Sequence, residues 1–136
     1  MLIQKLNESI QILNSLIEIT KRDIKNIKKA HHQEIFNNMK QKEELAKEFS
    51  NTKNDIDLIL SKRNKPIEEI FSYKEKEIFE EFKKKLIEFS TLHKKFSKLV
   101  TSVANFYDTL IQQIAGEKST NYNNNFFKNS NLSIKV

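Results

Sequence analysis

The chain has 136 residues, of which 31% are charged and 38% apolar, and its formal net charge is +6. This length suffices for one domain. The apolar content fits helices that each bury one stripe better than a globule with a thick core. Such a frame encloses no catalytic cavity, so we expect neither an enzyme nor a cofactor. Because the sequence has no cysteine, disulfides and cysteine-based metal sites are excluded.

The charges of both signs are mixed along the chain, with 24 Lys and Arg against 18 Asp and Glu. A one-sided basic face, which nucleic-acid binding usually requires, is not evident, so we expect no nucleic-acid partner. No apolar run approaches the ~20 residues of a membrane span, and we expect no membrane insertion. The N-terminus lacks the order of a secretory signal, which favours a cytoplasmic location.

The stretch from Met1 to Ala115 holds no glycine and one proline, Pro66. Glycine and proline are the strongest helix breakers, so this stretch predicts two long helices, about 2–61 and about 67–115, joined by a turn at 62–66. Gly116 stands where a helix C-terminus favours glycine. We therefore predict an all-α fold, a long antiparallel helical hairpin over 1–116, followed by a flexible Asn-rich tail over 117–136.

The first predicted helix has apolar residues at alternating spacings of three and four, as in a coiled coil. This seam comprises Ile3, Leu6, Ile10, Leu13, Ile17, Thr20, Ile24 and Ile27. It weakens over 31–42 and resumes out of register at Leu45, as after an insertion of about four residues in a heptad repeat. We expect a kink or a thinner contact there, and a short third helix stays open.

The second predicted helix has a broader apolar band than a two-stranded seam requires. Its stripe comprises Ile67, Phe71, Ile78, Phe82, Phe89, Phe96, Val103 and Leu110. Either a third helix packs on this band or a partner uses part of it. If the hairpin folds about 62–66, the first helix overhangs by about 12 residues, or ~18 Å. That overhang would expose Leu2, Ile3, Leu6, Ile10 and Ile12.

The sequence offers no constellation of catalytic or metal-ligating residues. His31 and His32 are adjacent, so they cannot share a helix face as metal ligands spaced by four do. His93 has no carboxylate at a useful spacing, and the surface pairs Glu43-Glu44 and Glu68-Glu69 are not desolvated, as catalytic carboxylates are. We predict no catalytic, cofactor-binding or metal site.

In its layout the chain resembles the FlgN family of flagellar export chaperones. The resemblance rests on a heptad-bearing first helix with a K-x-x-L segment, on a second amphipathic helix, and on a polar tail that has a tyrosine and a short basic, aliphatic ending. The corresponding residues are Lys42-Glu43-Glu44-Leu45, Thr120-Asn121-Tyr122 and Ser133-Ile134-Lys135-Val136.

The resemblance implies a cytoplasmic type III export chaperone that binds the C-terminal helical segment of hook-associated proteins and prevents their premature assembly. It also implies delivery to the cytoplasmic domain of the flagellar export gate, with Tyr122 as the docking residue. The substrate-protein surface would be the C-terminal half of the second helix. The expected binding residues are Phe89, Phe96, Leu99, Val103, Phe106, Leu110 and Ile114.

Two other functions stay open at this point. A structural coiled-coil protein would use its apolar excess entirely in self-association, as a homodimer, and the seam of the first helix motivates that alternative. A basic helical nucleic-acid binder is motivated by the net charge alone.

Overall fold

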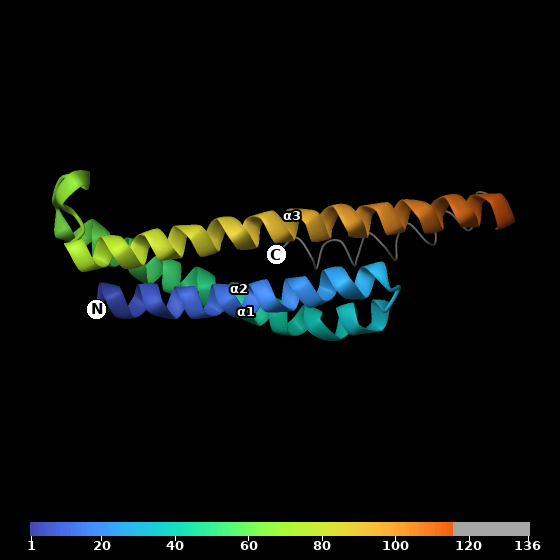
Figure 1. Ribbon diagram of the computed structural model, residues 1–136, viewed down its shortest axis with the longest axis horizontal. Coiled ribbons are helices and arrows are strands. Elements are labelled where there is room, and N and C mark those ends of the chain that lie inside the picture. The colour runs from blue at the N-terminus through green and yellow to red at the C-terminus, as the bar shows by residue number, and fades with distance from the viewer. Residues whose placement is uncertain (116–136) are drawn as a thin grey trace.

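The computed structural model describes residues 1–115, which form three α-helices and one short 3-10 helix (Figure 1). Helix α1 spans Leu2–Lys28, α2 spans His32–Arg63, η1 spans Ile67–Glu69 and α3 spans Tyr73–Ala115. The predicted all-α fold is confirmed. The tail over 117–136 lies outside the described residues.

The first predicted helix, 2–61, is two helices, because the chain reverses at residues 29–31. Ala30 takes a left-handed conformation with φ 60°. Its N–H donates to the Ile27 carbonyl at 3.2 Å, and the His31 N–H donates to the Asn26 carbonyl at 2.8 Å. These two bonds form a Schellman motif, in which the left-handed position is usually glycine. Since alanine stands there instead, the composition of the chain conceals the reversal.

The connection between α2 and α3 is longer than the predicted turn at 62–66. Asn64 caps α2 in a left-handed conformation, and Pro66 precedes η1 rather than a long helix. Helix α3 begins only at Tyr73, where Ser72 and Glu75 form a capping box: the Ser72 N–H donates to Glu75 Oε1, and the Glu75 N–H donates to Ser72 Oγ. It is described as far as Ala115.

Helix α1 packs against both α2 and α3, and α2 runs antiparallel to the other two helices (Figure 1). A stripe on α1 with spacings of four and three is buried between its two neighbours. Its residues are Leu2, Leu6, Ser9, Leu13, Leu16, Thr20, Asp23 and Ile27. Leu6, Leu13, Thr20 and Ile27 belong to the predicted seam, and the seam residues Ile17 and Ile24 are buried beside this stripe.

The predicted overhang of the first helix is wrong. Leu2 and Leu6 are 1% and 0% exposed, because α1 begins beside the α2–α3 connection and packs against Ile56 and Phe82. Helix α3 protrudes instead. Its 43 residues span ~65 Å, against ~40 Å for the 27 residues of α1. The C-terminal end of α3 therefore extends beyond the reversal at 29–31 (Figure 1).

Candidate protein-binding surface

The protruding end of α3, residues 104–115, is the candidate site, and we call it the overhang. The core ends just before it, where Val103 packs with Ile24, Ile27 and Ile35. The last described contact with α2 is an edge-to-face pair between the His32 and Tyr107 rings, whose centroids are 6.1 Å apart. Beyond this pair, α3 continues without α1 or α2 beside it (Figure 1).

The overhang continues the face of α3 that packs on α1 in the preceding part of the helix. Phe89, Phe96, Val103 and Leu110 follow one another at intervals of seven, so they lie along one stripe of α3. Phe96 is 0% exposed and Leu110 is 37% exposed, so the burial of this stripe in the bundle ends between these two residues. Phe106 and Ile114 flank the stripe and are 63% and 76% exposed. Apolar side chains gathered in this way on a surface are typical of an interaction site.

The overhang is also poor in charge. Asp108 is the one charged residue between Lys98 and Gly116, whereas charged residues are dense over 74–88. Depletion of charge at the centre of a patch distinguishes interface cores from ordinary protein surface. Asp108 Oδ1 is itself shielded and has no hydrogen-bond partner among the described residues.

The structure divides the seven predicted substrate-binding residues into two groups. Phe89, Phe96, Leu99 and Val103 belong to the two core clusters of the bundle, and Phe96 is fully buried. Phe106, Leu110 and Ile114 are exposed on the overhang. A partner can reach the second group directly, whereas contact with Phe96 would require the bundle to open. The predicted docking residue Tyr122 lies outside the described residues.

A cavity of about 340 Å³ lies between α2 and α3, with α1 as its floor. Most of its lining is apolar, and Met39, Phe49 and Phe89 contribute to it. The sequence analysis missed its polar centre, the pair of Asp23 and Lys42. Asp23, 0% exposed, accepts hydrogen bonds from Asn38 Nδ2 and Lys42 Nζ, both at 2.9 Å. The same ammonium lies 4.3 Å from the centre of the Phe96 ring.

His93 borders this cavity but behaves as an aromatic side chain. Burial, and then the charge of Lys42, lower its pKa, so the imidazole is neutral at neutral pH. Its ring lies 5.7 Å from that of Phe89. Within residues 1–115, no group of three or more His, Cys, Asp or Glu side chains is placed to hold a metal ion. The cavity therefore offers packing and one satisfied ion pair rather than reactive groups.

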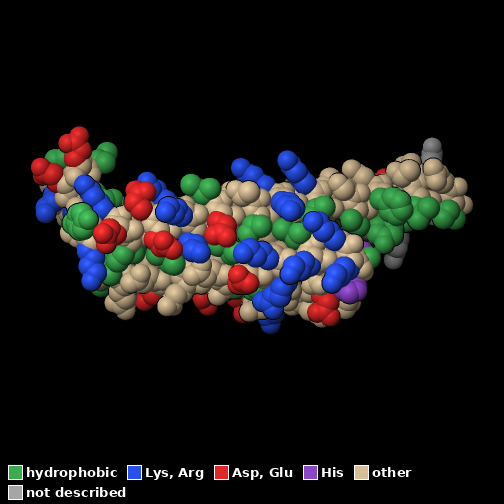
Figure 2. Space-filling model, in the orientation of Figure 1, with side chains coloured by type: hydrophobic (Ala, Val, Ile, Leu, Met, Phe, Trp, Pro, Cys, Tyr) green, Lys and Arg blue, Asp and Glu red, His purple; other side chains and the backbone are tan. Residues whose placement is uncertain are grey.

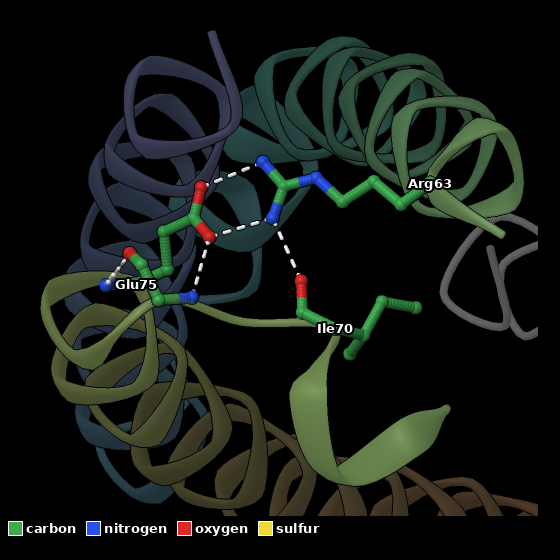
Figure 3. A network of polar contacts seen from close by, with 4 residues as sticks. Arg63, Ile70 and Glu75 are labelled. Carbon is green, nitrogen blue, oxygen red and sulfur yellow. Dashed lines mark hydrogen bonds and ion pairs between the residues drawn. The ribbon is translucent and has the colours of Figure 1, made fainter. Parts of the chain in front are cut away.

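A second polar network fixes the start of α3 (Figure 3). The Arg63 guanidinium donates to both carboxylate oxygens of Glu75, at 2.6 and 2.7 Å, and to the Ile70 carbonyl at 2.8 Å. The hydrogen bonds from Arg63 are the main cause that lowers the pKa of Glu75 to about 2, and the N–H of Ser72 adds to the effect against the opposing influence of burial. This network holds the α2–α3 connection and so sets the direction of α3.

Comparison with known proteins found no matching family model, no similar curated protein and no similar solved structure. In the described part of the chain, no helix has the length and apolar character needed to cross a membrane.

Proposed function

We propose that this protein is a helical export chaperone of the kind implied by the FlgN resemblance, and that it holds the C-terminal helical segment of a hook-associated protein on the overhang of α3. In this proposal the chain acts in the cytoplasm. It keeps its cargo from assembling early and delivers it to the cytoplasmic domain of the export gate through Tyr122.

One observation carries the proposal: the core-facing stripe of α3 continues for about 12 residues after the hairpin of α1 and α2 has ended. Phe106, Leu110 and Ile114 on this stretch are spaced by four. A groove-bound helix is recognised through anchors at spacings of three and four, and an exposed helix face with that spacing is the matching surface.

The position of the stripe favours a single helix as the occupant. The stripe continues the face by which α3 packs against the core, and the hairpin of α1 and α2 ends at the reversal at 29–31, before the overhang begins (Figure 1). A helix laid along this stripe would follow on from the hairpin and extend the three-helix bundle beyond its present end. Because the overhang spans only ~18 Å, the affinity should be moderate, which suits a carrier that must release its cargo.

The test compares two isoleucines of α3 that are similarly exposed. Ile114 lies on the overhang and is 76% exposed, and Ile87 lies on the outer face and is 66% exposed. We expect Ile114→Asp to weaken binding of a hook-associated protein from the same organism at least tenfold, because an aspartate would be desolvated in the interface. Ile87→Asp should leave the affinity unchanged. Equal affinity of both variants and of the original chain would refute the proposed site.

Self-association is the alternative that the same stripe supports, because the apolar stripes of two copies of the chain can also pack against each other. Stable dimers bury about 1,200–2,000 Å² or more, and a ~18 Å overhang offers little of that area. Sedimentation at tens of micromolar decides between the two. A monomer that binds cargo supports the chaperone, and a stable dimer that Ile114→Asp dissociates supports the structural coiled-coil protein.

A further inference from the structure

Basic side chains gather beside the overhang, where the sequence pattern showed only mixed charge. Figure 2 shows Lys and Arg side chains over the C-terminal half of α1 and the middle of α3, next to the apolar side chains at the protruding end. We call this group the basic collar. Its members are all exposed: Lys21, Arg22, Lys25, Lys28, Lys29, Lys94, Lys95 and Lys98.

The fold brings the two halves of the collar together. Ile24 and Ile27 of α1 pack in the same cluster as Phe96 of α3, so the segments 21–29 and 94–98 flank one contact. Lys21 Nζ reaches across it to within 3.9 Å of Glu88. On α3, Lys94, Lys95 and Lys98 line one surface depression with Leu99 and Ser102. Ser102 lies one helical turn before Phe106 in the sequence of α3.

The collar is short of acidic partners. The chain has no acidic residue between Glu88 and Asp108, and the only one within 21–29 is Asp23, which is buried and paired with Lys42. Among the described residues, Lys21 is the one collar member with an ion pair, to Glu18 and Glu88. The positive potential of the collar is thus left for an external anion.

We infer that the segment bound at the overhang is an acidic amphipathic helix of a partner protein, with carboxylates beside its apolar anchors. This inference rests on the proposed function and specifies the chemistry of the partner. The apolar face of such a helix covers Phe106, Leu110 and Ile114, while its Asp or Glu side chains lie against the collar. Complementary charge of this kind speeds association and selects the partner more than it raises affinity.

The geometry favours a protein helix over the two other polyanions that a basic patch attracts. The stripe continues the core-facing side of α3, the side on which the α1–α2 hairpin ends at the reversal at 29–31 (Figure 1). A flat bilayer surface meets the tip of the α1–α2 hairpin before it reaches this stripe. A nucleic acid would offer phosphates to the collar but nothing to cover the apolar side chains of the overhang.

The experiment uses the full chain and three synthetic peptides of about 18 residues that share one Leu stripe and carry Glu, Gln or Lys on the polar face. Binding is measured by fluorescence anisotropy at low and at physiological salt. We expect the Glu peptide to bind about tenfold more tightly than the Gln peptide at low salt, with the difference shrinking as salt is added. The Lys peptide should bind most weakly.

Two triple variants that remove the same charge serve as a matched pair. Lys25→Gln, Lys95→Gln and Lys98→Gln together should abolish the preference for the Glu peptide. Lys40→Gln, Lys47→Gln and Lys62→Gln, all exposed on α2, should retain it. The inference is overturned if the original chain binds the Glu and Gln peptides equally well. It is also overturned if both triple variants lose the preference for the Glu peptide.

The same variants separate a membrane from a protein partner, and they separate the inference from the proposed function. Suppose that the original chain binds phosphatidylglycerol vesicles, that the variant with Lys25→Gln, Lys95→Gln and Lys98→Gln does not, and that the chain shows no preference among the peptides. The collar then serves a lipid surface, and the inference fails. If the Gln peptide binds as well as the Glu peptide and Ile114→Asp weakens both, the inference fails while the proposed function stands.

Discussion

At the scale of single residues, two ion pairs explain how a slender bundle keeps its shape. Arg63 and Glu75 tie the end of α2 to the start of α3, and Asp23 and Lys42 tie α1 to α2 inside the bundle. Asp23 was invisible as a core residue in the sequence because it is charged. Its position on the heptad stripe of α1 was the signal that could have revealed it, since a polar residue at a seam position usually has a buried partner.

Glu75 gives the stability of the fold a defined dependence on pH. Its pKa is about 2 in the folded chain, against 4.5 for an ordinary glutamate. Because the folded-state pKa is the lower one, the pair stabilises the fold fully above pH 4.5 and loses this contribution as the pH falls toward 2. The free energy of unfolding, measured with urea between pH 7 and 2, should fall over that interval.

Replacement of Glu75 isolates this contribution from that of the other carboxylates. Glu75→Gln should lower the stability at pH 7 by about 1–3 kcal/mol and flatten the loss below pH 4.5. Glu77→Gln, an exposed change on the same helix, should behave as the original chain does. An unchanged acid profile in Glu75→Gln would show that the pair with Arg63 does not control the acid transition.

At the scale of the elements, the sequence predicts helices well and the reversal at 29–31 poorly. The all-α fold and six of the buried positions of α1 follow from heptad spacing and from the scarcity of Gly and Pro. The shift of register after residue 31 was visible, but a stutter in one helix and a break between two helices produce the same shift. Ala30 in the place of a capping glycine removed the remaining signal.

Ala30 offers a test of the reversal in which the sign of the effect is decisive. A left-handed alanine costs roughly 1–2 kcal/mol relative to glycine, so Ala30→Gly should stabilise the fold by about 0.5–1 kcal/mol after the entropy of the unfolded chain is included. The urea midpoint reports this change. In an unbroken helix over 2–61, the same substitution would destabilise the chain by about 1 kcal/mol, and that outcome would contradict the reversal.

At the scale of the whole molecule, the lengths of the helices decide where the apolar surplus lies. The sequence correctly indicated more apolar surface than two paired helices can cover, but it placed part of the surplus at the N-terminus. The reversal at 29–31 buries Leu2 and Leu6 and shortens the hairpin that accompanies α3. The surplus therefore moves to the C-terminal end of α3. Three of the seven predicted binding residues, Phe106, Leu110 and Ile114, lie there.

The central claim is that α1 and α2 leave the overhang uncovered and that cargo covers it. A helix end without tertiary packing exchanges its amide hydrogens through local fraying, whereas a packed one is protected. Hydrogen exchange followed by mass spectrometry should therefore show fast exchange over 104–115 in the free chain. It should show slow exchange over 89–100 in the same sample.

Addition of a saturating hook-associated protein should slow exchange over 104–115 at least tenfold and leave the segment 73–88 unchanged. Exchange over 104–115 that is already as slow as that of the core in the free chain, and that does not change when the cargo is added, would contradict the account.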